Sequence, residues 1–332
     1  MTLPGHLAIG LDTADFVMLS APTPWLIQAT EQDYFTPPGA RMMYEEARRW
    51  YRLYGAEDRI EFFVGPGPHG TPRVSREAIY KWLTRWLNNG HGDFHDLPVR
   101  QYSNHELLVT RTGRVEDEPG SRKVHHVILD GLKAKRSPGT AAELTAELRR
   151  LGIPTDRSAP RVKVLEEAAR EGFQDRHIRF ESETGIEIDA RLYLPRSSGR
   201  HPAVLFVAGK LSDLLAGKIA ETGSVALVLE PRHSRSYDDR RPYVGDWLAN
   251  TRADQIGASL PARRAHDILR GVDLLCSRED VYPNSIRAAG QGVKGIWLLL
   301  AATADPRIRK AWLDRTPYSL LEALQNTLNT SL

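Results

Sequence analysis

Two polar residues in the first third of the chain, Asp33 and His69, each follow a short apolar run that is typical of a buried strand. Asp33 comes after residues 25–30 and His69 after residues 60–64. Ligands of an open parallel sheet bind beyond the carboxyl ends of its strands. A carboxylate at one strand end can orient an imidazole at the next, which can then act as a general base. Taken alone, each is equally compatible with an ordinary loop residue, but together they are our candidate catalytic pair.

A glycine-rich turn, Gly290-Gln-Gly-Val-Lys-Gly295, lies between an apolar run at 286–289 and an apolar helical segment at 296–303. A strand, a tight turn and a helix in this order can present a reactive group at the turn. The glycines also match the dinucleotide-binding pattern. That pattern belongs at the first strand of a βαβ unit, with an acid about 20 residues further on. Because this turn comes late in its sheet, we expect no nucleotide and no cofactor.

The elements that must position these residues fall into three regions. Residues 1–90 contain the two strands above, a helix over 41–54, and a helix that Ser75 can cap and whose apolar stripe runs to Leu87. Residues 91–176 read as a connector, with strands at 106–110 and 124–129 and a helix over 140–151. Residues 177–332 predict strands at 177–181, 186–194, 203–208, 225–229, 286–289 and 309–313, and a helix over 260–276. Strands that alternate with helices predict a doubly wound, mostly parallel α/β sheet.

Composition excludes several classes of protein. The 332 residues are 41% hydrophobic and 26% charged, as in globular proteins, and the net charge of +3 comes from interspersed residues, so we expect no nucleic-acid partner. No apolar run is long enough to span a membrane, and the N-terminus does not resemble a signal peptide, so we expect a cytoplasmic protein without membrane contact. One cysteine, Cys276, and histidines without ligand partners at suitable spacing predict no metal site.

Both ends of the chain resemble parts of an α/β-hydrolase of the acetyl-xylan-esterase and dienelactone-hydrolase-like group. Residues 15–88 resemble its C-terminal third, and residues 177–315 resemble its N-terminal two-thirds, so the order of the two parts is inverted. The resemblance implies that Asp33 is the triad acid and His69 the triad base. The first match rests on Asp15-Phe16, Ala21-Pro-Thr-Pro24, Asp33-Tyr-Phe35, Tyr54-Gly55-Ala56, Gly67-Pro-His-Gly70 and the helix from Arg76 to Leu87.

The sequence departs from this family at the nucleophile. The family carries Gly-x-Ser-x-Gly at a strand-to-helix elbow. Here Gly290 opens the motif, Gly292 stands at the serine position, and Val293 and Lys294 follow. Lys294 could bind a substrate anion or simply be solvated. A replacement nucleophile is conceivable at Ser212, in the stretch Gly209-Lys210-Leu211-Ser212 that matches the oxyanion-hole loop, or less readily at Ser234 or Ser236.

Two architectures explain the inverted order. The chain is either a junction of two tandem hydrolase domains or one circularly permuted sheet, with residues 1–90 and 177–332 as its parts and 91–176 as the tether. The second region contributes six predicted strands and the first two, together the eight of the resembled fold. An open sheet edge would be an aggregation hazard, so we favour pairing of the two parts, within a chain or in a homo-oligomer.

Two functions follow from these features. The Asp33–His69 pair favours a carboxylic-ester hydrolase that acts on a small-molecule ester, with low activity because Gly292 offers no nucleophile. The glycine itself favours the alternative, a non-catalytic module derived from an esterase that serves in binding or as a structural partner.

Overall fold

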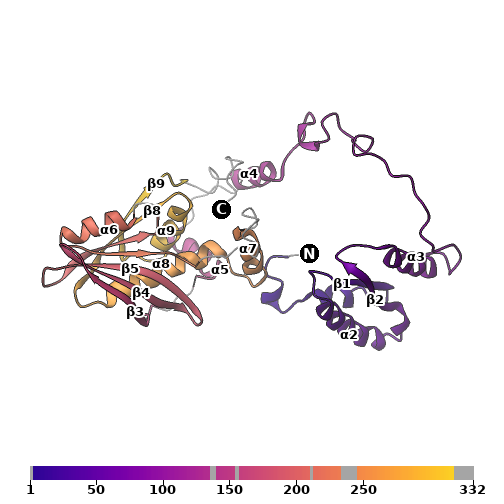
Figure 1. Ribbon diagram of the computed structural model, residues 1–332, viewed down its shortest axis with the longest axis horizontal. Coiled ribbons are helices and arrows are strands. Elements are labelled where there is room, and N and C mark those ends of the chain that lie inside the picture. The colour runs from indigo at the N-terminus through magenta and orange to yellow at the C-terminus, as the bar shows by residue number, and fades with distance from the viewer. Residues whose placement is uncertain (1–2, 135–139, 154–156, 210–211, 233–244, 318–332) are drawn as a thin grey trace. The chain divides into compact units, whose positions relative to one another are not determined.

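The computed structural model describes residues 3–134, 140–153, 157–209, 212–232 and 245–317. Residues Ile9–Pro119 form one compact unit, here called the small unit (Figure 1). The described parts of Met1–Ala8 and Gly120–Leu332 form the other, here called the large unit. No helix of the described residues is long and apolar enough to cross a lipid bilayer.

The large unit is built on a seven-stranded sheet in the order β3-β4-β5-β7-β6-β8-β9. The three pairs from β3 to β7 are antiparallel, and the three from β7 to β9 are parallel. The sheet is therefore mixed, and a mostly parallel sheet is not confirmed. Its strands are β3 (Val162–Ala169), β4 (Phe173–Glu183), β5 (Ile186–Pro195), β6 (His201–Val207), β7 (Val225–Leu229), β8 (Val281–Gln291) and β9 (Ile308–Asp314).

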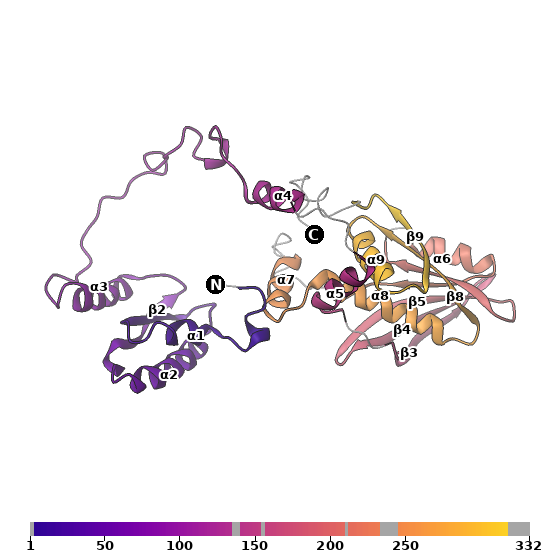
Figure 2. The same cartoon turned by 180° about the vertical axis from the view of Figure 1, so that it is seen from behind.

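Helices cover both faces of this sheet (Figures 1 and 2). On β6, Leu205 belongs to the core under α8 and α9, while the next residue, Phe206, belongs to the core under α6. Successive side chains of a strand point to opposite faces of the sheet, so β6 is buried on both sides. The helices of the large unit are α4 (Val124–Ala134), α5 (Ala141–Arg150), α6 (Ser212–Glu221), α7 (Gly245–Gln255), α8 (Leu260–Ser277) and α9 (Val293–Ala304).

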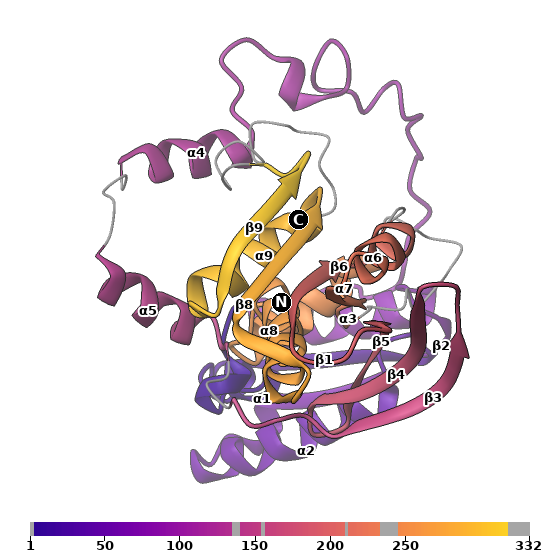
Figure 3. The ribbon, with the colours of Figure 1, turned by 90° about the vertical axis from the view of Figure 1, so that its left-hand side faces the viewer.

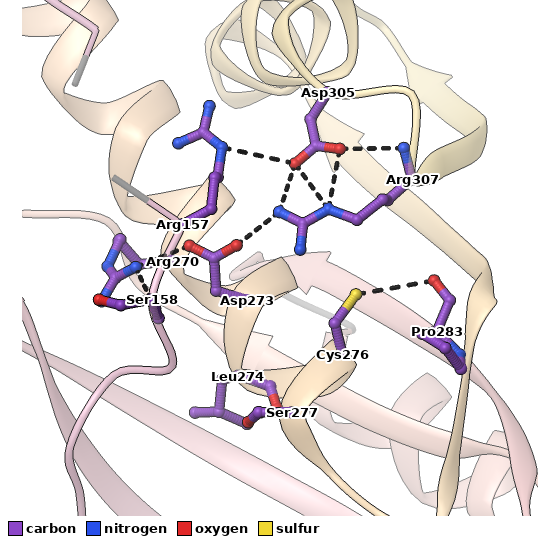
Figure 4. Close-up of polar contacts among 10 residues, drawn as sticks. All are labelled: Arg157, Ser158, Arg270, Asp273, Leu274, Cys276, Ser277, Pro283, Asp305 and Arg307. Atoms are coloured by element: carbon purple, nitrogen blue, oxygen red, sulfur yellow. Dashed lines mark hydrogen bonds and ion pairs between the residues drawn. The ribbon is translucent and has the colours of Figure 1, made fainter. Parts of the chain in front are cut away.

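A network of buried charges ties three segments of the large unit together (Figure 4). On α8, Asp273 pairs with Arg270 at 2.7 Å and also with Arg307, the residue before β9. Arg307 binds Asp305 at 2.6 Å as well. Arg270 in turn donates to the carbonyl oxygen of Ser158 at 2.6 Å. The network therefore holds the segment before β3 and the start of β9 against α8.

The small unit contains two parallel strands, three α-helices and two short 3-10 helices, Glu57–Arg59 and Val115–Asp117. Its core forms where α1 and α2 pack on one face of the strands, and it includes Ile27, Tyr51 and Ile60. The phenol of Tyr51 is buried and donates to the carbonyl oxygen of Thr23 at 2.6 Å. These elements are α1 (Thr13–Met18), β1 (Trp25–Gln32), α2 (Pro37–Leu53), β2 (Ile60–Pro68) and α3 (Arg73–Leu87).

Most predicted elements on both sides of the connector are found, but three predictions within residues 75–129 are wrong. Residues 124–129 lie in α4, because a short apolar run cannot by itself distinguish a helix from a strand. Residues 106–110 form turns and bends, not a strand. Ser75 is not the cap of α3, which begins at Arg73 and has Pro72 at the N-cap.

The connector also contains a strand that the sequence did not reveal. β3 forms one edge of the seven-stranded sheet and carries Lys163, Glu166 and Glu167, so it lacks the apolar pattern of an inner strand. The predicted neighbour relation between residues 25–30 and 309–313 is not confirmed. β1 pairs with β2 in a sheet of two, and β9 pairs with β8 (Figure 3).

Candidate active site

Asp33 and His69 lie together where β1 and β2 end. The Nδ1 atom of His69 lies 2.9 Å from Oδ1 of Asp33 and 3.1 Å from Oδ2. The Asp33 side chain is 9% exposed and that of His69 is 48% exposed. Since Nδ1 faces the carboxylate, the geometry of the ring directs Nε2 away from it. The contact expected from the sequence is present, and its catalytic role remains a prediction.

The neighbours of Asp33 hold its carboxylate in place. The Thr30 hydroxyl donates to Oδ2 at 3.1 Å, and the Phe35 N–H donates to Oδ1 at 2.9 Å. Partial burial raises the pKa of Asp33, but hydrogen bonds from Phe35, His69 and Thr30 outweigh it and hold that pKa below its ordinary value. The carboxylate is therefore ionised at neutral pH and able to stabilise a protonated imidazole.

Two aromatic rings stand beside this pair. The ring centroid of Tyr34 lies 4.4 Å from that of His69, and the centroid of Phe35 lies 5.6 Å from it. Reasoning from the sequence did not assign Tyr34, Phe35 or Thr30 to the site. The available signal was their position within three residues of the candidate acid.

In the large unit, Gly292 forms a sharp turn between β8 and α9. Its backbone angles, φ +58° and ψ −135°, lie in a region that favours glycine. A Cβ added at Gly292 would have no atom within 4 Å, so a side chain would extend into open space. Gly290 is needed for another reason, because a Cβ there would lie 3.0 Å from the Cα of Gly295, where strand and helix meet. The turn has the shape of an elbow and carries no nucleophile.

The first turn of α9 supplies polar groups next to this elbow. The N–H groups of Val293 and Lys294 have no acceptor within the helix, because they belong to its first turn. The Lys294 Nζ donates to the carbonyl oxygen of Ala208 at 2.6 Å and to the Glu230 carboxylate at 2.9 Å. Lys294 is thus neither simply solvated nor a free cation. It connects α9 to the residues that follow β6 and β7.

A cleft of about 760 Å³ opens over the elbow in the described part of the large unit. It combines the backbone of the turn with the charged groups of Lys294, Glu230 and Arg315, and so offers room for a small polar molecule. Its lining residues are Ala208, Gly209, Glu230, Gln291, Gly292, Val293, Lys294 and Arg315.

Of the three serine candidates, the structure describes only Ser212. Ser212 is the first residue of α6 and is buried; its hydroxyl accepts from the Gly209 N–H at 2.9 Å and donates to the Gly209 carbonyl at 2.7 Å. These bonds engage the hydroxyl with the backbone of Gly209, and a nucleophilic role remains a prediction. Lys210, Leu211, Ser234 and Ser236 lie outside the described residues.

Comparison with known proteins finds similarity to solved structures only. No family model matches the chain, and no curated protein does. A proposed acetyl xylan esterase from Bacteroides fragilis is 13% identical with a TM-score of 0.47, and the match covers 62% of each chain. A glucuronoyl esterase from Solibacter usitatus is 14% identical with a TM-score of 0.40, over 64% of this chain and 63% of that one.

The third such structure is acetyl xylan esterase 1 from Thermoanaerobacterium, with 16% identity, a TM-score of 0.39 and coverage of 52% of this chain and 57% of that one. The chain spans about three fifths of the length of these proteins. Two of these three proteins carry the name acetyl xylan esterase, which is also the group that the sequence resembles. These structures do not show the inverted order of the two parts of the fold that the sequence predicts for this chain.

Proposed function

We propose that the chain is a carboxylic-ester hydrolase in which His69, oriented by Asp33, is the general base. The observation that carries the proposal is the contact of Nδ1 with the Asp33 carboxylate at 2.9 Å and 3.1 Å. That contact fixes the tautomer in which Nε2 is free to accept a proton. Since Gly292 provides no hydroxyl, the attacking group is water, and the substrate is a small ester. We expect no cofactor to take part.

In the proposed reaction, Nε2 of His69 takes a proton from water as the water oxygen forms a bond to the ester carbonyl carbon. Asp33 stabilises the imidazolium that results. The N–H of Val293 would stabilise the negative oxygen of the tetrahedral intermediate. When the carbon–oxygen bond to the alcohol breaks, the imidazolium returns its proton to the alkoxide. Triad enzymes without their nucleophile keep about 10³- to 10⁴-fold acceleration over water, so we expect weak turnover.

This mechanism needs groups from both units, and we propose that they meet because β1 pairs with β9 in one circularly permuted sheet. β2 carries Pro66 and Pro68, which suit an outer strand, whereas β1 contains no proline and has a single paired edge. Parallel strands are otherwise found in larger, covered sheets. Within the part of the chain that the structure describes, the sheet of the large unit ends at β9, whose second edge is also unpaired. Pairing of β1 with β9, within one chain or between two copies, would satisfy the unpaired backbone N–H and C=O groups of both edges.

Hydrogen exchange on the full chain, together with sedimentation, tests this assembly. Backbone N–H groups on the outer edges of β1 and β9 should exchange slowly if the strands pair, because paired amides are protected. A monomer with protected edges indicates that β1 and β9 pair within one chain. A dimer with protected edges indicates that β1 of one copy pairs with β9 of the other. Rapid exchange at both outer edges would refute the assembly.

The hydrolase proposal is tested by turnover of p-nitrophenyl acetate. His69→Ala should lower kcat/KM by about 10²- to 10⁴-fold relative to the wild type, as expected for loss of a general base. His95→Ala is a matched control, because His95 also contacts an aspartate, Asp93, but both side chains are exposed outside any strand. Equal activity of the wild type and His69→Ala would refute the proposal. No turnover at all would favour the non-catalytic binding or structural module.

A further inference from the structure

We infer that Tyr34 and Phe35 form the subsite for the alcohol part of the ester, and that this subsite selects aryl esters. The inference rests on the proposed function, since it assigns the leaving group of the same reaction. It concerns residues of the small unit alone, Tyr34, Phe35 and His69, whose rings contact one another directly.

The two rings form an exposed apolar surface next to the imidazole. Tyr34 is 71% exposed and Phe35 is 66% exposed, although both are large aromatic residues. Their centroids lie 4.5 Å apart, and the ring planes are tilted by 43°. A surface of this kind presents both faces and edges to a further flat ring, which aromatic contacts favour.

The backbone holds this surface in place before any ligand arrives. The Phe35 N–H is fixed on the Asp33 carboxylate, and α2 begins two residues later with Pro37 and Pro38. Proline restricts the backbone at the start of a helix, so little backbone freedom remains to be lost on binding. The two aromatic side chains are therefore arranged for contact with a ligand and do not contribute to the core.

The chemistry of the reaction places the alcohol part of the ester at this surface. The imidazolium of His69 must deliver its proton to the leaving alkoxide, which requires the alkoxide oxygen within hydrogen-bond reach of Nε2. The group attached to that oxygen then lies beside the imidazole ring. Tyr34 and Phe35 both contact that ring, at 4.4 Å and 5.6 Å between centroids. A phenyl group would stack there, whereas a short alkyl group would gain little.

The test compares kcat/KM for phenyl acetate and ethyl acetate in the full chain. Tyr34→Leu and Phe35→Leu should each lower the value for phenyl acetate by about 2- to 10-fold and leave that for ethyl acetate within about 2-fold. Tyr34→Phe should retain the wild-type ratio, because it keeps the ring. Tyr54→Leu is the matched control, since Tyr54 is an exposed tyrosine at the end of α2 whose ring lies near Trp50. Equal losses on both esters would overturn the inference.

A second readout separates this subsite from catalysis. Phenol should shift the NMR resonances of the His69 and Tyr34 rings in a saturable way, and Tyr34→Leu should weaken that binding. Phenol binding without any ester turnover would show an aryl-binding surface but would overturn both the hydrolase and the role of that surface in it. Turnover without a shift on adding phenol would keep the hydrolase and overturn the subsite. Binding of methyl β-glucopyranoside in place of phenol would overturn the assignment to aryl alcohols.

Discussion

The ammonium group of Lys294 lies 2.6 Å from the carbonyl oxygen of Ala208 and 2.9 Å from the carboxylate of Glu230. One side chain at the start of α9 thus binds the residues that follow two neighbouring strands. Lys294 stands where the resembled motif has its last glycine. Its long side chain therefore converts a position next to the elbow into a link across the carboxyl edge of the sheet.

Lys294→Met should lower the free energy of unfolding by about 1 kcal/mol. A charge-assisted hydrogen bond contributes about 1.5–3 kcal/mol, and the exposure of Glu230 reduces that value. Chemical denaturation at low and high salt measures the effect, which should shrink as salt screens the ion pair. Lys163→Met, on the exposed face of edge strand β3, is the control. Equal unfolding curves for Lys294→Met and the wild type would contradict the link.

Asp33→Asn should lower ester turnover on the order of 10²- to 10⁴-fold without unfolding the protein, because the amide cannot stabilise the imidazolium or select its tautomer. The pKa of Asp33 lies below its ordinary value of 3.8, so the carboxylate stays charged above that pH. Loss of wild-type activity between pH 5 and 8 therefore cannot come from Asp33. Asp93→Asn changes the exposed aspartate beside His95 and should leave turnover intact. Full activity of Asp33→Asn would show that the pair is not catalytic.

The sequence was sufficient to predict the inner strands of the seven-stranded sheet, and the contact of Asp33 with His69 at the ends of β1 and β2. The five residues of β7 are all buried, as the uninterrupted apolar run of residues 225–229 predicted for a strand covered on both faces. The contact of Asp33 with His69 followed from one rule about parallel strands. The sequence did not predict edge strand β3. A strand paired on one side only tolerates charged residues such as Lys163 and Glu167, which an inner strand would not, so β3 lacks an apolar pattern.

What the sequence could not predict depends on contacts between distant residues. Arg270 and Asp273 read as ordinary polar positions on a helix, yet both are buried. Their burial is tolerated because Arg307 and the Ser158 carbonyl, far away in the chain, complete the network. The roles of Tyr34 and Phe35 likewise became visible only when the loop brought their rings against His69.

Asp305→Asn should lower the free energy of unfolding by about 1.5–3 kcal/mol at neutral pH, because the partly buried Arg307 guanidinium loses one of its two carboxylate partners and keeps only Asp273. Burial raises the pKa of Asp305, but hydrogen bonds from Arg307 outweigh burial and lower it. A lowered folded-state pKa means that the contribution is complete above pH 3.8 and is lost as the pH falls through the folded-state pKa.

The difference between the wild type and Asp305→Asn should therefore be constant from pH 5 to 8 and shrink below pH 3.8. Chemical denaturation at each pH measures it. Asp280→Asn is the control, because the pair of Asp280 with Arg278 is partly exposed and should contribute about 1 kcal/mol or less. A difference that persists unchanged well below pH 3.8 would show that Asp305 does not act through its charge.

Gly292→Ser should raise ester turnover, because it restores a hydroxyl at the tip of the elbow. Nothing lies within 4 Å of a Cβ built at Gly292, so the side chain fits without displacing a neighbour. The cost lies in the backbone, since φ +58° strains a residue other than glycine by about 1–3 kcal/mol. In Gly292→Ser, turnover of p-nitrophenyl acetate should rise above the weak wild-type rate, and labelling by a fluorophosphonate should appear. Gly292→Ala bears the same strain without a hydroxyl and should show neither the rise nor the label.

The same experiment separates the empty elbow from a nucleophile elsewhere. If the wild type hydrolyses short esters rapidly and Ser212→Ala abolishes that activity, Ser212 is the nucleophile and Gly292 is incidental. A rapid wild type that is unaffected by Ser212→Ala, Ser234→Ala or Ser236→Ala would place the site outside the elbow and its neighbouring loops. If Gly292→Ser folds but gains neither label nor turnover, His69 does not reach the elbow. The proposed pairing of β1 with β9 would then fail, because that pairing is what brings the imidazole to Gly292.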